Sequence, residues 1–247
     1  MGTVYAVHLY LVRHGVTEWN RQGRYYGQTD LPCLPHMWHL FDGLKSRLAG
    51  LVFDQVYSSD LTRCRQTLDY LAPSVAKSAC YDHRLREYHF GAWEGRTHSD
   101  LEQDHLYQAW LNDMESVAPS GGEKWAQFKG RIDQWLSEVL TTSGQKAEQS
   151  HLAPGESVRG YPDSLQVPTA AQHCPVRILT VTHGGVIRYL LSQWGVTSSM
   201  WEAPIHTGQA YVLELSREKG GWRCTASWVE PSPASGPLSG HAHKARS

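Results

Sequence analysis

Apolar side chains follow one another with little alternation in two stretches of the chain, residues 4–12 and 177–182. Continuous apolar runs of this length are typical of strands buried on both faces, as in a parallel sheet. A shorter run over residues 53–57 predicts another strand, and residues 210–216 and 222–229 predict a hairpin around a Gly-Gly turn.

Between these strands the spacing of apolar residues becomes helical. An aromatic row at steps of three and four predicts a buried helix face within residues 123–140; its members are Trp125, Phe128, Ile132, Trp135 and Val139. Further helices are expected over residues 38–48, from the N-cap types Ser58-Ser59-Asp60 through Leu71, and over residues 99–114 and 184–194. Strands that alternate with helices predict an α/β fold, a three-layer α/β/α sandwich. Its sheet should be mostly parallel, with helices on both faces and a small helical cap over the site.

The length of 247 residues fits one domain with a cap. We expect this domain to cover residues 1–230, with the cap at about residues 88–140. Residues 141–174 are rich in Ser, Gly, Pro and Gln and are expected to form an irregular insertion. Residues 231–247 carry few apolar side chains, so a flexible C-terminal tail is expected there.

The composition argues against several classes of protein. Lys and Arg number 23 and Asp and Glu number 24, so no basic excess indicates nucleic-acid binding. No apolar run approaches the ~20 residues that span a bilayer, and the first residues lack the pattern of a secretory signal. The five cysteines are scattered, with no Cys-x-x-Cys pair, which favours reduced thiols. We therefore expect a cytoplasmic protein that binds a small molecule, and a homodimer stays open.

Each of the two long apolar runs ends in a histidine followed by glycine. Arg13-His14-Gly15 follows the first run, and His183-Gly184-Gly185 follows the second. In open α/β sheets ligands bind outside the carboxyl ends of the strands, so the two imidazoles are expected to meet there. A lone histidine at such a place is more often structural, but Arg13 adds a planar fork of donors that matches a phosphate or a carboxylate. The pair predicts an anionic substrate and a covalent intermediate on histidine.

Four ordered motifs resemble those of the histidine phosphatase superfamily, in the branch with the cofactor-dependent phosphoglycerate mutases and many small phosphatases. They are Leu-Val-Arg-His-Gly-Val-Thr-Glu-Trp-Asn at residues 11–20, Tyr-Ser-Ser-Asp-Leu-Thr-Arg-Cys-Arg-Gln-Thr at 57–67, Leu-Arg-Glu-Tyr-His-Phe-Gly-Ala-Trp-Glu-Gly at 85–95 and Val-Thr-His-Gly-Gly at 181–185. The resemblance covers most of residues 5–215. Within the branch the chain is most similar to small phosphatases such as the α-ribazole phosphatases and the broad-specificity phosphatases.

The resemblance and the chemistry together assign expected roles. His14 is the expected nucleophile, and Glu87 is the expected proton donor and then general base. Arg13, Arg63 and His183 would surround the phosphoryl oxygens, because phosphoryl transfer depends mainly on positioning and charge stabilisation. The remaining expected contacts are Asn20 and the Gly184 amide for phosphate, and Gln28 and Thr207 for substrate.

Each role has a plainer alternative. Glu87 can be a loop carboxylate paired with Arg84 or Arg86, and His183 can be a core histidine. Glu94 follows Trp93 in a turn and is expected to be structural. The side chains of Tyr88, Tyr107 and Trp110 either line a pocket for an aromatic base or pack the cap. His36 with His39, and His241 with His243, lack a third ligand, so no metal and no cofactor is expected.

Hydrolysis of a phosphomonoester is the favoured reaction. The acidic motif leads directly into a predicted helix, whereas the mutases carry a long insertion at this point. Phosphoglycerate mutase-type transfer and a non-catalytic phospho-ligand binding module remain alternatives. Residues 33–40 depart from the family pattern, since Cys-Leu-Pro-His-Met-Trp-His-Leu replaces a segment with a capping threonine, and the helix there should start differently.

Overall fold

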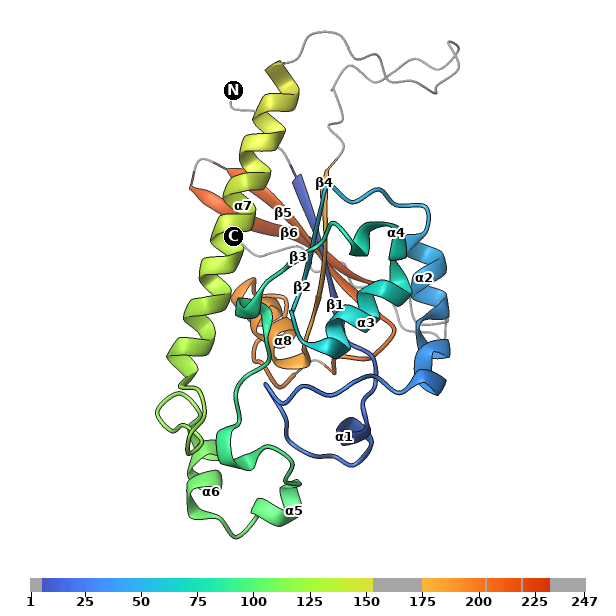
Figure 1. Ribbon diagram of the computed structural model, residues 1–247. Helices are drawn as coiled ribbons and strands as arrows, with labels where there is room; N and C mark the ends of the chain where they lie inside the picture. Colours follow the sequence, from blue (N-terminus) through green and yellow to red (C-terminus); the bar gives the residue numbers. More distant parts are fainter. Residues whose placement is uncertain (1–5, 153–174, 203, 219, 232–247) are drawn as a thin grey trace, which may run out of the picture.

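A single six-stranded sheet forms the centre of the protein (Figure 1). The computed structural model describes residues 6–152, 175–202, 204–218 and 220–231. The strands lie in the order β3-β2-β4-β1-β5-β6. Neighbours from β3 to β1 are parallel, and β5 and β6 continue the sheet antiparallel. The strands are β1 Ala6–Arg13, β2 Gln55–Ser58, β3 Cys80–Tyr81, β4 Val176–Thr182, β5 Ala210–Glu218 and β6 Gly221–Glu230.

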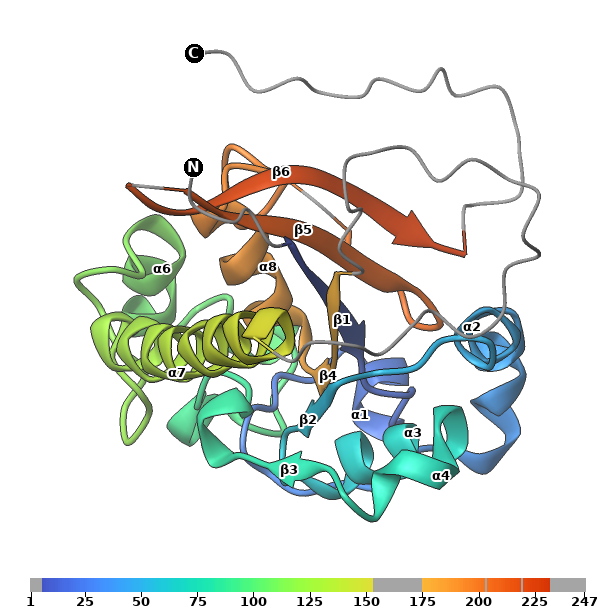
Figure 2. The same ribbon diagram turned by 90° about the horizontal axis from the view of Figure 1, so that it is seen from above.

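Helices cover both faces of this sheet, which confirms the predicted three-layer arrangement (Figure 2). One face carries α2 (Asp42–Leu48), α3 (Thr62–Leu71) and α4 (Pro73–Ala76), and the other carries α7 (Trp125–Leu152) and α8 (Gly184–Gln193). Alternate residues of β1 enter the two apolar clusters: Tyr10 and Val12 pack on the α2–α3 side, and Leu9 and Leu11 on the α7–α8 side. Burial on both faces explains why the apolar runs of the sequence do not alternate.

The long helix α7 extends twelve residues beyond the predicted end at residue 140, so the expectation of an irregular insertion from residue 141 is wrong for its first part. The backbone stays helical through the polar residues there, and the hydroxyls of Thr141, Thr142 and Ser143 are satisfied within the helix by donating to the carbonyls four residues before them. The buried aromatic face of this helix is confirmed. Residues 153–174 of the insertion and 232–247 of the tail lie outside the described residues.

Three other helix starts differ from the predictions. The segment that departs from the family pattern forms a 3-10 helix, Pro35–Phe41, before α2. The helix predicted over residues 99–114 is divided into α5 (His98–Leu101) and α6 (His105–Asn112), because Asp104 caps α6 by accepting from two backbone amides. Helix α3 begins after Leu61, which makes no side-chain cap. The amide and hydroxyl of Thr62 instead donate to Asp30, a loop residue far away in the sequence.

The short helices α1 (Glu18–Arg21), α5 and α6 lie around the carboxyl ends of the parallel strands (Figure 1). Thr17 caps α1 through a reciprocal capping box with Asn20. Helices α5 and α6 lie together beyond this end of the sheet, beside the start of α7 (Figure 1). Within the described residues, none of the helices has the length and apolar character to cross a membrane. The remaining short helices are the 3-10 turns His83–Leu85 and Gly91–Trp93.

Candidate active site

His14 and His183 meet at the carboxyl ends of two neighbouring strands, as the sequence predicts. The register pairs Arg13 of β1 with Thr182 of β4. The His14 amide continues this ladder by donating to the Thr182 carbonyl at 2.9 Å. The two imidazole centroids lie 5.0 Å apart, and the exposed fractions of the residues are 4% and 0%. Parallel pairing thus brings the two histidines to one buried place.

The ring of His14 is held as a neutral imidazole with a defined tautomer. Its Nδ1 lies 2.7 Å from the carbonyl oxygen of Gly15, which can only accept, so Nδ1 carries the proton. Burial, reinforced by the positive charges of Arg63 and Arg13, holds the pKa of His14 well below its usual range. Nε2 is therefore left unprotonated and able to act as a nucleophile.

The backbone of Gly15, whose carbonyl orients His14, is fixed by a further hydrogen bond. Its amide donates to the hydroxyl of Thr67 at 2.8 Å, and this hydroxyl donates to the Arg63 carbonyl at 2.6 Å. A Cβ at Gly15 would lie 2.9 Å from Cys33 Sγ and 2.9 Å from the Trp38 ring. Only glycine fits here, and the residues of the divergent segment 33–40 close this wall.

His183 lies against protein groups on both ring nitrogens. Nδ1 accepts from Arg63 Nε at 3.3 Å, and Nε2 lies 2.9 Å from the Ser59 hydroxyl. Since Arg63 can only donate, the proton of the neutral ring is on Nε2. Burial is the main reason that the pKa of His183 lies well below its usual range, and the charge of Arg63 adds to this effect. Ser59, expected as a possible helix cap, thus serves to orient His183.

The two arginines reach this place from different elements. Arg63, on α3, is fully buried; it donates to the carbonyls of Gly27 and Thr29, and its guanidinium lies over the Tyr26 ring with 4.6 Å to the centroid. Arg13 donates from Nη1 to the Ile205 carbonyl at 2.8 Å. Arg13 Nε is buried and has no hydrogen-bond partner among the described residues. The site therefore holds fixed positive charge beside the nucleophile.

Glu87 lies at the amino end of α8. Its Oε2 accepts from the Gly185 amide at 2.8 Å, and its Oε1 from the Tyr88 amide at 2.9 Å. The plainer alternative of an ion pair with Arg84 or Arg86 is wrong. Those arginines bind other carboxylates: Arg84 pairs with Asp82 and Glu138, and Arg86 pairs with Asp60.

One residue that the sequence reasoning missed holds the loop of Glu87. Arg131 of α7 donates to the carbonyls of Arg84, Arg86 and Glu87, and its guanidinium is fixed by a bidentate ion pair with Glu123. On the other side, the Thr182 hydroxyl donates to the Leu85 carbonyl at 2.8 Å. The sequence could have indicated the ion pair, because Glu123 and Arg131 are eight residues apart along the helix region. It could not have indicated that Arg131 also donates to the three backbone carbonyls.

The other predicted site residues lie around this centre. Asn20 accepts from the Tyr26 hydroxyl at 2.8 Å, and Gln28 accepts from Arg86 at 3.4 Å, so both are in the polar wall next to Arg63. Gly184 begins α8 between two guanidiniums: a Cβ there would lie 3.7 Å from both Arg13 Nε and Arg188 Nη1. Thr207 lies in the turn before β5, and its hydroxyl makes no hydrogen bond to the groups around His14 in the described part of the chain.

Glu94 has the structural role expected for it. Its carboxylate accepts from the backbone amides of Gln28, Thr29 and Phe90, which ties the loop after β1 to the acidic motif. Burial acts to raise the pKa of Glu94, but hydrogen bonds from the Thr29 hydroxyl and from the backbone amides of Gln28 and Thr29 hold it below its usual range. In the residues that the structure describes, no three His, Cys, Asp or Glu side chains are grouped as a metal site requires.

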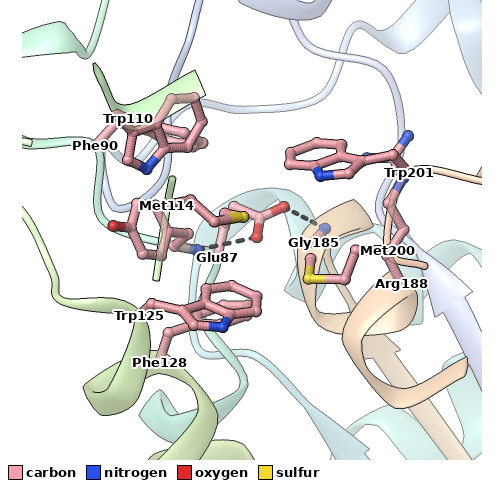
Figure 3. Close-up of a pocket in the computed structure, with 11 residues that line it drawn as sticks. Glu87, Phe90, Trp110, Met114, Trp125, Phe128, Gly185, Arg188, Met200 and Trp201 are labelled. Carbon is pink, nitrogen blue, oxygen red and sulfur yellow. Dashed lines mark hydrogen bonds between the residues drawn. The ribbon is translucent and has the colours of Figure 1, made fainter. Parts of the chain in front are cut away.

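A narrow aromatic slot opens beside Glu87 (Figure 3). Its cavity is about 80 Å³. Trp201, which is 63% exposed, faces Trp110 and Trp125 across this slot. Tyr107 is absent from the lining and packs in the cap against Tyr25 and Trp93. The lining residues are Glu87, Tyr88, Phe90, Trp110, Met114, Trp125, Phe128, Gly185, Arg188, Met200 and Trp201.

Comparison with known proteins agrees with this geometry. The family model of the histidine phosphatase superfamily (branch 1) matches residues 9–152, more than half of the chain, so the protein belongs to this superfamily. The adenosylcobalamin/α-ribazole phosphatase of Escherichia coli is 32% identical over 133 residues, which are 53% of this chain and 66% of that protein. A Klebsiella pneumoniae protein described as "Probable phosphoglycerate mutase GpmB" is 31% identical over 140 residues, 53% of this chain and 62% of that protein.

The match to these curated relatives thus spans slightly less than two thirds of their length. Among solved structures, the α-ribazole phosphatase from Shigella flexneri superposes with a TM-score of 0.66 at 25% identity. That superposition covers 88% of this chain and 94% of the other. The similarity in structure therefore extends well beyond the part that the family model matches.

The buried histidines predict a loss of stability in mild acid. In the unfolded chain histidine takes a proton at a pKa of about 6.5, whereas burial lowers the pKa of His14 and His183 in the folded protein. The unfolded state therefore binds more protons below that pH, so stability is complete above it and falls as the pH drops, by up to about 1.4 kcal/mol per pH unit for each ring. Urea unfolding between pH 7.5 and 5 measures how steeply the free energy of unfolding falls with pH. This slope should become smaller in His183→Gln. An unchanged slope in that variant and in His14→Gln would contradict the conclusion that both buried rings are neutral in the folded protein.

The hydrogen bond from the Gly15 amide to the Thr67 hydroxyl predicts that two substitutions of Thr67 have different effects. Thr67→Val keeps the shape but leaves the buried Gly15 amide without an acceptor, so the free energy of unfolding should fall by about 1–3 kcal/mol. Displacement of the Gly15 carbonyl should also lower kcat by about tenfold to a hundredfold. The matched control, Thr67→Ser, keeps the hydroxyl and should retain most of the activity; similar losses in both variants would exclude this role for the hydroxyl.

Proposed function

We propose that this protein is a phosphomonoester hydrolase that works through a phosphohistidine on His14. The observation that carries the proposal is the state of the His14 ring. The ring is neutral, it is fixed by the hydrogen bond between Nδ1 and the Gly15 carbonyl, and it lies beside Arg13 and Arg63. A neutral imidazole with a free Nε2 is what nucleophilic attack on phosphorus requires. The adjacent guanidiniums suit the charge on the phosphoryl oxygens. Membership of the superfamily supports the same reaction.

In the first step Nε2 of His14 forms a bond to phosphorus, and the bond from phosphorus to the alcohol oxygen breaks. An alkoxide is a poor leaving group, so Glu87 gives its proton to that oxygen as the bond breaks. Arg13, Arg63 and the Gly184 amide stabilise the transferring group. His183, which was expected from the sequence to lie beside the phosphoryl oxygens, is bonded on both ring nitrogens to Arg63 and Ser59, so its proposed role is to hold Arg63 in place. The products of this step are the free alcohol, a phosphohistidine and an ionised Glu87.

In the second step a water molecule attacks the phosphorus of the phosphohistidine. Glu87, now a carboxylate, accepts one proton from this water, and the bond between phosphorus and Nε2 breaks. Inorganic phosphate leaves, the imidazole returns to its neutral form, and Glu87 is again protonated for the next cycle. One carboxylate therefore acts as acid and then as base.

Hydrolysis is preferred over transfer because of the way the chain continues after Glu87. A mutase must keep water away from the phosphoenzyme. Here the acidic motif leads through short helices α5 and α6, and the slot next to Glu87 is bordered by the largely exposed Trp201. An open slot admits water, which supports the phosphatase. The similarity to a protein described as a phosphoglycerate mutase keeps transfer as the second candidate.

The substrate is proposed to be a small phosphorylated metabolite whose alcohol carries a flat apolar group. Glu87 must reach the leaving oxygen, so the alcohol has to lie on the side of the slot that Glu87 lines. The walls there are Trp110, Trp125 and Trp201, which suit a planar ring. Relatives named α-ribazole phosphatases agree with this choice. The free cysteines of the described residues favour a reducing compartment, and we propose the cytoplasm.

A labelled substrate tests the reaction. Brief reaction with a ³²P-labelled phosphomonoester in the presence of EDTA, followed by alkaline denaturation, should leave label on His14 and release inorganic phosphate. His14→Ala should lose both, and His105→Ala, an exposed histidine of the cap, should keep both. With 3-phosphoglycerate and its bisphosphate, free phosphate is expected rather than the isomer; accumulation of the isomer would establish the mutase instead, and label on no histidine would end the proposal.

The aromatic slot predicts selectivity between two alkyl phosphates of similar leaving-group chemistry. The phenyl ring of 2-phenylethyl phosphate can stack in the slot and should raise kcat/KM above that of ethyl phosphate. Trp201→Ala should reduce this ratio by about threefold to tenfold, in line with the free energy of an aromatic contact. Leu106→Ala, which removes an exposed apolar side chain outside the slot, is the control. A ratio that is the same in the wild type and in Trp201→Ala would place the alcohol elsewhere.

A further inference from the structure

The carboxylate of Glu87 occupies space that exists only because residue 185 has no side chain. A Cβ built on Gly185 would lie 3.0 Å from Cδ of Glu87, 3.3 Å from Oε2 and closer still to Oε1. The amide of the same residue donates to Oε2 at 2.8 Å. Gly185 therefore affects the Glu87 carboxylate in two ways: its amide donates a hydrogen bond, and its missing side chain leaves the space that the carboxylate occupies.

We infer that Gly185 is a positioning residue that sets where Glu87 presents its proton. The inference rests on the proposed function, because it assumes that Glu87 is the proton donor. Helix α8 is ten residues long, and Gly185 lies in its first turn, where the amides point out of the helix toward Glu87. A methyl group at this position would push the carboxylate off the amide.

The backbone of Glu87 cannot follow such a shift easily. Three carbonyls of its loop, those of Arg84, Arg86 and Glu87, accept from Arg131, which is itself held by Glu123. Thr182 holds the Leu85 carbonyl from the side of the sheet. The remaining freedom is in the side-chain torsions of Glu87, so a methyl group at residue 185 should rotate the carboxylate into the slot.

The contact between residue 185 and the Glu87 carboxylate predicts that Gly185→Ala loses catalysis and keeps the fold. The atoms that a new Cβ would meet belong to the free end of a flexible side chain, and no backbone atom is among the three nearest. Alanine also suits a helix better than glycine does. The melting temperature of Gly185→Ala should therefore stay close to that of the wild type, and the change should appear only in the two steps in which Glu87 gives or accepts a proton, the first of which determines kcat/KM.

The test compares two leaving groups. With ethyl phosphate, whose alkoxide needs a proton, Gly185→Ala should lower kcat/KM by about a hundredfold, within the range of general acid catalysis. With p-nitrophenyl phosphate, whose leaving group needs little protonation, the loss should stay below about threefold. Equal losses on both substrates would overturn the inference, since a general disturbance of the site does not distinguish leaving groups.

Two further variants separate the role of Gly185 from other causes. In a Glu87→Ala background the same Gly185→Ala change should have almost no additional effect, because there is no carboxylate left to displace. Gly130→Ala adds a methyl group to α7 at a position with open space, and it is the matched control for a glycine-to-alanine change in a helix. An undiminished effect of Gly185→Ala without the Glu87 carboxylate would overturn the inference.

The same measurements separate failure of the inference from failure of the proposed function. If Glu87→Ala shows the difference between ethyl and p-nitrophenyl phosphate and Gly185→Ala does not, the acid is correct and Gly185 does not position it. If Glu87→Ala itself loses equally on both substrates, the assignment of the acid is wrong, and the inference is overturned with it.

Discussion

The parallel pairing of β1 with β4 is the constraint on which the whole site depends. Its register sets Arg13 opposite Thr182, so the next residue of each strand is a histidine and the two rings meet 5.0 Å apart. A slip of one residue would turn every side chain of β1 to the opposite face of the sheet. Leu9 and Leu11 would then exchange clusters with Tyr10 and Val12, and the apolar packing on both faces therefore holds the register in place.

Burial then gives the histidines their chemistry. Two imidazoles and a fully buried arginine share one small space, and in this space a proton on either ring would face the charge of Arg63. The rings stay neutral, and the hydrogen-bond partners around them decide which nitrogen carries the proton. The Gly15 carbonyl decides it for His14, and Arg63 decides it for His183. The nucleophile is thus prepared by its surroundings before any substrate binds.

Several predictions from the chain alone were correct because they depended on local pattern. The strand ends, the aromatic face of α7 and the structural role of Glu94 follow from spacing and composition over a few residues. The errors concern places where a polar side chain, near or distant in the sequence, decides the local structure against the apolar spacing. Asp30 caps α3 in place of the residues just before it, and Asp104 divides a helix that apolar spacing presents as one. Helix α7 continues through residues 141–143, whose composition suggests a loop, and Ser143 there accepts from Gln55 of β2.

The sequence by itself determined five of the six strands that the structure describes and the longer helices in their order along the chain, the two histidines at strand ends and the family to which the chain belongs, because these features depend on neighbouring residues and on motifs. It did not predict the two-residue strand β3. Only the tertiary structure decided which tautomer His14 adopts, that Arg131 holds the loop of Glu87, and that Gly185 leaves room for its carboxylate. The contacts of Arg131 and Gly185 with Glu87 join segments 44 and 98 residues apart. The partner of His14 is the next residue, but the backbone of Gly15 is held by Thr67, 52 residues further along the chain. The distances and directions of such contacts are set by the packing of the whole fold, which a local pattern does not contain.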